Sequence, residues 1–353
     1  MRIGTLVLAL GVVPAWATAQ QPSSSDSLHQ RGDTLARPIS LQEITVTAAP
    51  SKREAPASFV TITPAEIQRT SATSPYDLLR QTAGIEVHEQ GQGPGFASDA
   101  SVRGFSSDHS TDLALWIDGV PINEPVNGHA EGYNDWSLLM PEAVSTIDVI
   151  KGPSSALYGN FALAGVVNVR TLERMQGTIA SASGGSYERF EGSVLTGLDR
   201  GRTGAVFGLR GLRDGGWRPN GGSTLGQAHA RVVQDLSAKT SIDFGAELYA
   251  AGWDSPGFIL VPQFEQHRFD SVANRTDGGF KHRAQERVSL RVLAGSSLTW
   301  RSTVYATQGR WQLFLTTPPE GGITEGTGSQ LEEEDRRYGF GATSALTWIL
   351  PRA

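Results

Sequence analysis

The chain of 353 residues contains no cysteine, which excludes disulfides, thiolate nucleophiles and cysteine-bound zinc or iron–sulfur centres. Positive charge is also scarce: 30 Lys and Arg stand against 36 Asp and Glu, so no basic field favours a nucleic-acid partner. The longest apolar run, residues 3–13, is too short for a bilayer-spanning helix. No Walker loop and no convergent set of nucleophile, base and orienting group is present, so we expect neither an enzyme nor a bound cofactor.

The first apolar run has the form of a secretory signal peptide. Arg2 precedes it, Pro14 ends it, and Ala17-Thr18-Ala19 supplies the small residues at which a signal peptidase cuts. We therefore predict a signal peptide over residues 1–19 and an exported protein. Residues 20–40 are polar, Ser-rich and aperiodic, which predicts a flexible leader without a core of its own.

Residues 41–48 read LQEITVTA, a short run of β-prone residues between the leader and a Pro-containing segment. A single strand needs a partner for its backbone groups. The run is therefore either the first strand of the following domain or a segment that adds to the sheet edge of another protein.

The segment that follows has a mixed α/β pattern. Thr63-Pro64 and Ser74-Pro75 are helix-start signals, and Asp118-Gly119 is a hairpin-turn dipeptide. Short apolar runs between polar loops predict strands at 85–88, 113–117, 146–150 and 166–169. We therefore expect one small, compact domain.

From residue 172 onward, apolar and polar residues alternate. In this part Ile242, Phe244 and Leu248 fall on one face of a strand and Asp243 and Glu247 on the other. Short connections alternate with long ones, as in outer-membrane barrels whose apolar face meets lipid. The alternative is a soluble sandwich, which packs the apolar face inward. The alternation predicts about eight strands, at 177–184, 187–198, 204–213, 226–236, 241–250, 287–294, 298–308 and 338–349.

Tryptophan and charge add two expectations about this second part. An interfacial girdle needs aromatic residues near strand ends, which favours the barrel. The acidic run at residues 332–335 is expected in a solvated loop edge. The tryptophans near predicted strand ends are Trp217, Trp253, Trp300, Trp311 and Trp348.

Four segments in order resemble the TonB-dependent outer-membrane receptors: LQEITVTA at 41–48, SVRGF at 101–105, WIDGVPIN at 116–123 and VSTIDVIKGPSSALYGNFALAGVVNVR at 144–170. The resemblance implies a TonB box at 41–48, an α+β plug domain at 50–171 and the N-terminal portion of a transmembrane β-barrel at 172–353. The fold class is thus an α+β plug followed by antiparallel transmembrane strands, about eight of an expected 22. On this basis we expect the chain to be a C-terminally truncated fragment.

The resemblance also implies a function. Such receptors import scarce, bulky solutes across the outer membrane, most often an iron–siderophore, with cobalamin, other metal chelates or oligosaccharides as alternatives. Their partners are TonB with its inner-membrane energising complex, outer-membrane lipid and the small-molecule or metal-chelate substrate. A passive porin or an adhesion protein is the other class of reading, but neither has a use for a TonB box or a plug.

Candidate site residues follow from the resemblance and from loop position. Arg103 matches a family arginine that contacts acidic residues of the barrel. Three of the loop residues are histidines, but their spacing matches no ligand motif, so we predict no metal site. The predicted TonB-binding residues are Glu43, Ile44, Thr45, Val46, Thr47 and Ala48. The predicted substrate-binding residues are His88, Glu89, Gln90, Phe96, Asp108, His109, His129, Tyr133 and Trp136.

Overall fold

A computed structural model describes residues 58–70, 72, 74–89, 93–154, 156–319 and 328–349. The predicted signal peptide, leader and TonB box, and Gln90 among the predicted substrate contacts, lie outside the described residues. No described helix has the length and apolar content needed to span a membrane.

The N-terminal domain, residues 58–171, is built on a five-stranded sheet with the order β1-β6-β7-β4-β5. β4 and β7 are parallel, and the other neighbours are antiparallel. A separate antiparallel ladder joins β2 and β3. The strands are β1 (Ser58–Ile62), β2 (Ile85–His88), β3 (Asp99–Val102), β4 (Leu113–Ile117), β5 (Val120–Pro121), β6 (Val144–Lys151) and β7 (Gly165–Thr171).

Local sequence explains several of these elements. The Thr63 side chain accepts a hydrogen bond from the Glu66 backbone N–H, and the Glu66 carboxylate accepts one from the Thr63 N–H, so a capping box starts α1. Asp118 and Gly119 have φ of 49° and 87°, which gives the hairpin turn between β4 and β5 its predicted form. The helices are α1 (Pro64–Arg69), α2 (Val261–Glu265) and the single-turn 3₁₀ helices η1 (Pro75–Leu78), η2 (Asp108–Ser110), η3 (Trp136–Leu138), η4 (Pro141–Ala143) and η5 (Ala156–Tyr158).

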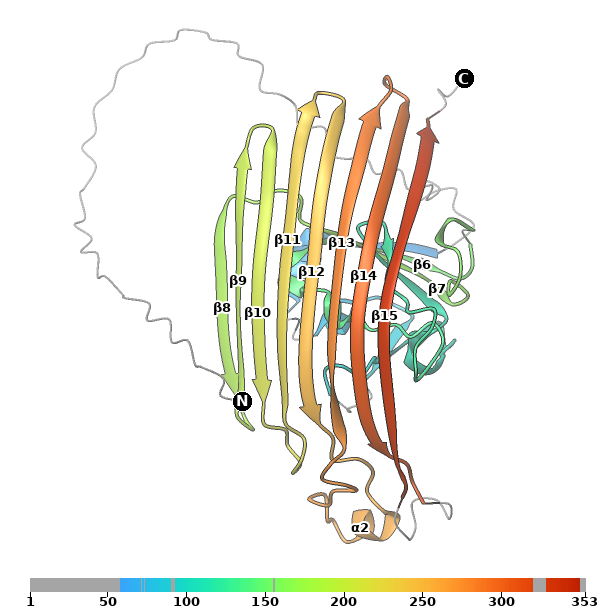
Figure 1. Cartoon of the computed structure of the whole chain (residues 1–353), viewed down its shortest axis with the longest axis vertical. Coiled ribbons are helices and arrows are strands. Elements are labelled where there is room, and N and C mark those ends of the chain that lie inside the picture. Colours follow the sequence, from blue (N-terminus) through green and yellow to red (C-terminus); the bar gives the residue numbers. More distant parts are fainter. Residues whose placement is uncertain are drawn as a thin grey trace, which may run out of the picture. The chain divides into compact units, whose positions relative to one another are not determined.

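Among the described residues from 177 to 348, eight strands form one antiparallel sheet in sequence order, here called the wall sheet (Figure 1). The predicted number of strands is therefore confirmed. The strands are β8 (Gly177–Gly185), β9 (Arg189–Arg200), β10 (Thr203–Asp214), β11 (Ser223–Ser237), β12 (Thr240–Asp254), β13 (Gly278–Leu293), β14 (Leu298–Thr316) and β15 (Gln330–Trp348).

The last three strands are longer than the sequence pattern predicts, and the difference changes one expectation. The acidic run Glu332–Asp335 lies within β15, paired with β14, so its placement in a loop edge is wrong. The alternation puts Glu333 and Asp335 on the inner face, where each contacts the N-terminal domain. Pairing with β14 therefore decides the conformation of this run despite its low apolar content.

The two faces of the wall sheet differ in the sense expected for a barrel. On β12, Glu247 and Tyr249 of one face are buried. Phe244 and Leu248 of the other face are exposed. The polar face packs on the N-terminal domain, so the sandwich alternative, with its apolar face inside, is wrong.

The tryptophans divide between the two faces. Trp217, Trp300 and Trp348 are exposed, as a girdle requires. Trp253 and Trp311 are buried on the inner face and belong to the core shared with the N-terminal domain, so their assignment to the girdle is wrong. Their positions near strand ends are compatible with either role, and only the alternation along β12 and β14 distinguishes the faces.

Candidate functional site

The loop between β2 and β3 packs directly on the wall sheet. Gly93 and Gly95 lie against the Trp253 ring so closely that a Cβ at either position would overlap it. Between them, the Pro94 carbonyl accepts a hydrogen bond of 2.9 Å from the Tyr249 hydroxyl. This loop therefore has glycine where its backbone lies directly against an indole ring.

A first ion-pair cluster centres on Asp118, in the hairpin turn between β4 and β5. Its carboxylate lies 3.2 Å from Arg231 Nη1 and 3.1 Å from Arg287 Nη2. It also accepts hydrogen bonds from the Thr171 hydroxyl and backbone N–H, at 2.6 and 3.0 Å. Asp243 of the wall sheet bridges the same two arginines. The cluster thus ties the turn and the end of β7 to three wall strands, β11, β12 and β13.

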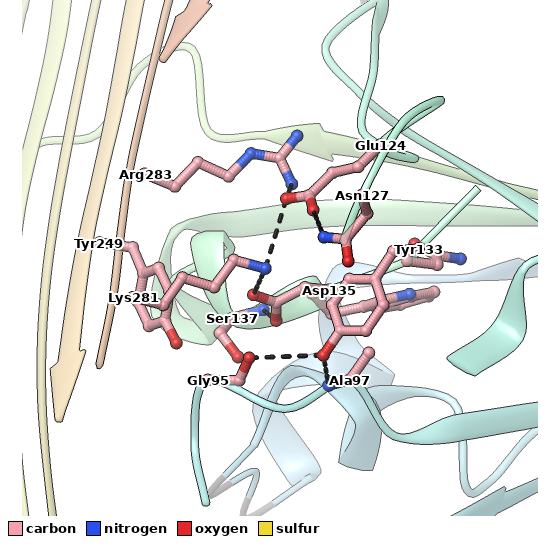
Figure 2. A network of polar contacts seen from close by, with 12 residues as sticks. Gly95, Ala97, Glu124, Asn127, Tyr133, Asp135, Ser137, Tyr249, Lys281 and Arg283 are labelled. Carbon is pink, nitrogen blue, oxygen red and sulfur yellow. Dashed lines mark hydrogen bonds and ion pairs between the residues drawn. The ribbon is translucent and has the colours of Figure 1, made fainter. Parts of the chain in front are cut away.

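A second cluster lies around Lys281, where Figure 2 shows the carboxylates of the N-terminal domain facing wall cations. Lys281 Nζ is 2.9 Å from the Asp135 carboxylate and 3.3 Å from Glu124. Glu124 is also 3.2 Å from Arg283 Nη1 and 2.6 Å from Arg337 Nη2. Asn127 donates to Glu124 from within the same loop. The acidic side is the N-terminal domain, and the basic side is the wall.

Burial and charge act in opposite directions on these carboxylates. Burial of Glu124 works to raise its pKa, but Lys281, Arg283 and Arg337 together lower that pKa to about 2. Burial likewise opposes ionisation of Asp118, yet Arg231, Arg287 and the Thr171 hydrogen bonds hold its pKa well below the usual range. Both carboxylates are therefore charged at neutral pH, as paired buried acids are.

An aromatic cluster adjoins the second ion-pair cluster, because Lys281 Nζ lies 4.7 Å from the centroid of the Tyr133 ring. The His109 and His129 rings are 4.7 Å apart, and Phe96 contacts both, at 4.9 and 5.1 Å. Trp311 of the wall lies 5.6 Å from Tyr133. His129 Nδ1 lies 3.0 Å from the Glu333 carboxylate of β15. Burial lowers the pKa of His109.

The predicted substrate contacts fall into two groups. Phe96, His109, Tyr133 and Trp136 are between 0% and 5% exposed, so they are buried although their sequence positions are in loops. They carry apolar and ring surface that the core of the N-terminal domain and the wall sheet buries. His88, Glu89 and Asp108 are exposed, and His129 is partly exposed. For all eight of these residues, substrate contact stays a prediction.

Arg103 and the group of Asp99, Asp108 and His109 are not part of the two ion-pair clusters. Arg103 is exposed at a φ of 53°, and no carboxylate of the described wall strands pairs with it, so its predicted contact remains untested. Asp99, Asp108 and His109 place one ligand atom each within 4.8 Å of one another. Three such groups fall short of the four ligands of a closed zinc site, and we assign no metal to them.

The ion-pairing residues themselves escaped the sequence reasoning. A signal existed, because Lys281, Arg283 and Arg287 alternate along one face. However, the glycines at the start of β13, and His282 and Glu286 on its other face, obscure the strand there. The acidic partners lie in turns, where carboxylates are ordinarily solvated.

Residues 51–166 match the family described as TonB-dependent Receptor Plug Domain. A vitamin B12 transporter, BtuB, of Vibrio vulnificus strain YJ016 is 33% identical over 230 residues, which cover 64% of this chain and 35% of the relative. The chain thus spans about a third of the length of this curated relative.

Solved structures share the fold at low identity. The unliganded ferric citrate transporter FecA superposes with a TM-score of 0.69 at 16% identity, over 84% of this chain and 45% of that one. The siderophore receptor PiuA from Acinetobacter baumannii gives 0.66 at 16% identity, over 84% and 43%. The copper transporter OprC gives 0.63 at 17% identity, over 83% and 44%. The arrangement of the N-terminal domain and the eight strands is therefore shared with these proteins.

Proposed function

We propose, from the premise that this chain belongs to the TonB-dependent receptors, that the complete protein imports a scarce, bulky solute across the outer membrane. The N-terminal domain is the plug, and the wall sheet is part of the barrel that it closes. The family consists of transport receptors and not of enzymes, in agreement with the absence of catalytic motifs.

The observation that carries the proposal is the charged contact between plug and wall. Asp118, Glu124 and Asp135 of the plug each pair with buried cations of the wall sheet. A wall cation that lost its plug carboxylate while it stayed buried would be uncompensated, so the pairs favour the docked position of the plug. When the plug moves, its carboxylates and the wall cations can be solvated by water. The contact can therefore open when work is supplied.

TonB supplies that work in the proposal. The run LQEITVTA would pair with an edge strand of TonB through its backbone, and pulling on it would reach β1 first, at one edge of the plug sheet. The exposed plug residues His88, Glu89 and Asp108, with His129, would contact the solute before it passes.

The TonB step is tested with the complete receptor carrying Ile44→Pro or Val46→Pro. Proline removes a backbone donor and should abolish strand pairing and uptake. Ser24→Pro, in the leader, is the matched control and should transport normally. Undiminished uptake by the variants at 44 and 46 would contradict the assignment.

An iron–siderophore is the solute that we propose first, because it is the most frequent solute of the family. Cobalamin is the second candidate, because the relative at 33% identity is a vitamin B12 transporter. Cells that carry the complete receptor as their sole TonB-dependent importer would be offered labelled cyanocobalamin or labelled ferric siderophores. TonB-dependent accumulation of cobalamin alone would make cobalamin, and not an iron–siderophore, the first candidate for the solute.

A further inference from the structure

We infer that the inner face of β11 to β13 is an anion-selecting wall of the import path, so that the solute presents negative charge where it passes. This inference rests on the proposed import function and deepens it, since it names the charge class of the solute. Its basis is an imbalance of charge on that face.

The inner face of these strands holds more cations than carboxylates. Asp243 is shared by two arginines, with Oδ2 2.7 Å from Arg231 Nη2 and 3.0 Å from Arg287 Nη1. Glu247 faces His229 and Gln285. The charged residues of this face are the cations Arg231, Lys281, Arg283, Arg287 and Arg291, and the carboxylates Asp235, Asp243 and Glu247.

Two of the wall cations depend on the plug for their counter-charge. Among the described residues, Lys281 and Arg283 form ion pairs with plug carboxylates alone. By contrast, Arg210 and Arg337, at neighbouring positions, also have wall carboxylates, Glu191 at 2.7 Å and Asp335 at 3.1 Å. Displacement of the plug therefore leaves the face of β11 to β13 with a positive charge.

An uncompensated cationic wall attracts anions. Low-dielectric walls focus the field of such charges, and rings of Arg and Lys are the means by which anion pores select. A plug that only needed anchoring could be held by pairs of either polarity. The carboxylates of these pairs, Asp118, Glu124 and Asp135, are all on the plug, which moves. Their cationic partners are on the wall, which stays, so the open path has a positive charge.

The test uses a single thiol, because this chain contributes none of its own. Thr307 lies on the inner face of β14, opposite Gln285 and between the positions opposite Arg283 and Arg287. Thr307→Cys in the complete receptor would be labelled in cells, with and without TonB, by methanethiosulfonates of similar size that carry a sulfonate or a trimethylammonium group. The measured quantity is the ratio of the sulfonate rate to the trimethylammonium rate, relative to that of a free thiol.

We expect this ratio to exceed that of a free thiol in TonB-energised cells and to fall on the order of fivefold in Arg283→Gln. Glu124→Gln breaks the same ion pair from the plug side but keeps the cation, so the ratio should not fall. Arg310→Gln removes a cation from the outer face of β14, the strand that carries Thr307, and should leave the ratio unchanged.

Three results would overturn the inference: a ratio no higher than that of a free thiol, equal falls in Arg283→Gln and Glu124→Gln, or no labelling by either reagent. A failure of the proposed function looks different. In that case, the labelling rates would be the same with and without TonB, whatever the ratio of the two reagents.

Discussion

Gly95 is a plug residue that lies against Trp253 of the wall with no space for a side chain. In Gly95→Ala the new Cβ would overlap the six-membered ring of Trp253, and we expect a loss of roughly 1–3 kcal/mol in plug docking. The matched control is Gly128→Ala, in another plug loop, where no atom lies within 4 Å of a new Cβ. Limited proteolysis of the complete receptor measures the effect, and equal protease resistance of the two variants would contradict it.

Glu124 gives the docked plug a defined dependence on pH. A carboxyl group whose folded pKa is lowered contributes stability above its unfolded pKa and loses that stability as the pH falls through the folded value. For Glu124 the loss should run from about pH 4.5 down to about pH 2.

We therefore expect the urea concentration that releases the plug to fall on acidification through this window, and to fall less in Glu124→Gln. At neutral pH, Glu124→Gln should itself cost roughly 3–5 kcal/mol, because it leaves Lys281 and Arg283 short of a buried partner. A neutral-pH midpoint equal to that of the wild type would show that the pairs do not hold the plug.

At the scale of elements, the plug sheet pairs its strands without the wall. β6 and β7 lie in the middle of the sheet and are flanked by β1 and β4. We therefore predict that residues 41–171, expressed alone, form a soluble monomeric α/β domain. Circular dichroism and NMR dispersion measure this, and a random-coil spectrum with collapsed dispersion would count against it.

Local sequence was sufficient to predict β2, β4, β6 and β7, but it did not predict β1 or β3. β2 and β4 have the predicted bounds, because turn residues and loops delimit their apolar runs. The second helix start was less well predicted, since Ser74-Pro75 opens only a 3₁₀ turn. The parts of β13 to β15 at residues 278–286, 309–316 and 330–337 could not be predicted, because consecutive charges such as Glu332–Asp335 hide the alternation and only pairing with the neighbouring strand sets their conformation.

The site was harder to predict than the fold for a related reason. Loop position identified the segments that carry Phe96, His109 and Tyr133, but it could not show that the wall buries them. Burial of these side chains depends on contacts more than a hundred residues away along the chain, such as the packing of Trp311 on Tyr133. Periodicity within one segment carries no information on such contacts.

At the scale of the whole molecule, the described wall sheet is open, because β8 and β15 each pair with one neighbour. Each unpaired backbone group in hydrocarbon costs several kcal/mol. We therefore expect residues 1–353, expressed alone, to give no heat-modifiable membrane species on a gel, whereas the complete receptor should give one. A protease-resistant, heat-modifiable band from residues 1–353 would contradict this reasoning.

The central claim is that buried ion pairs hold the plug against the wall, and a double-mutant cycle on Asp135 and Lys281 tests it most directly. The two side chains are 2.9 Å apart, and both are 1% exposed. Asp135→Asn keeps an oxygen that can cap η3, and Lys281→Met keeps most of the side-chain volume. Urea release of the plug in the complete receptor should give a coupling energy of roughly 1.5 kcal/mol or more. Additivity within about 0.5 kcal/mol would show that the pair does not hold the plug.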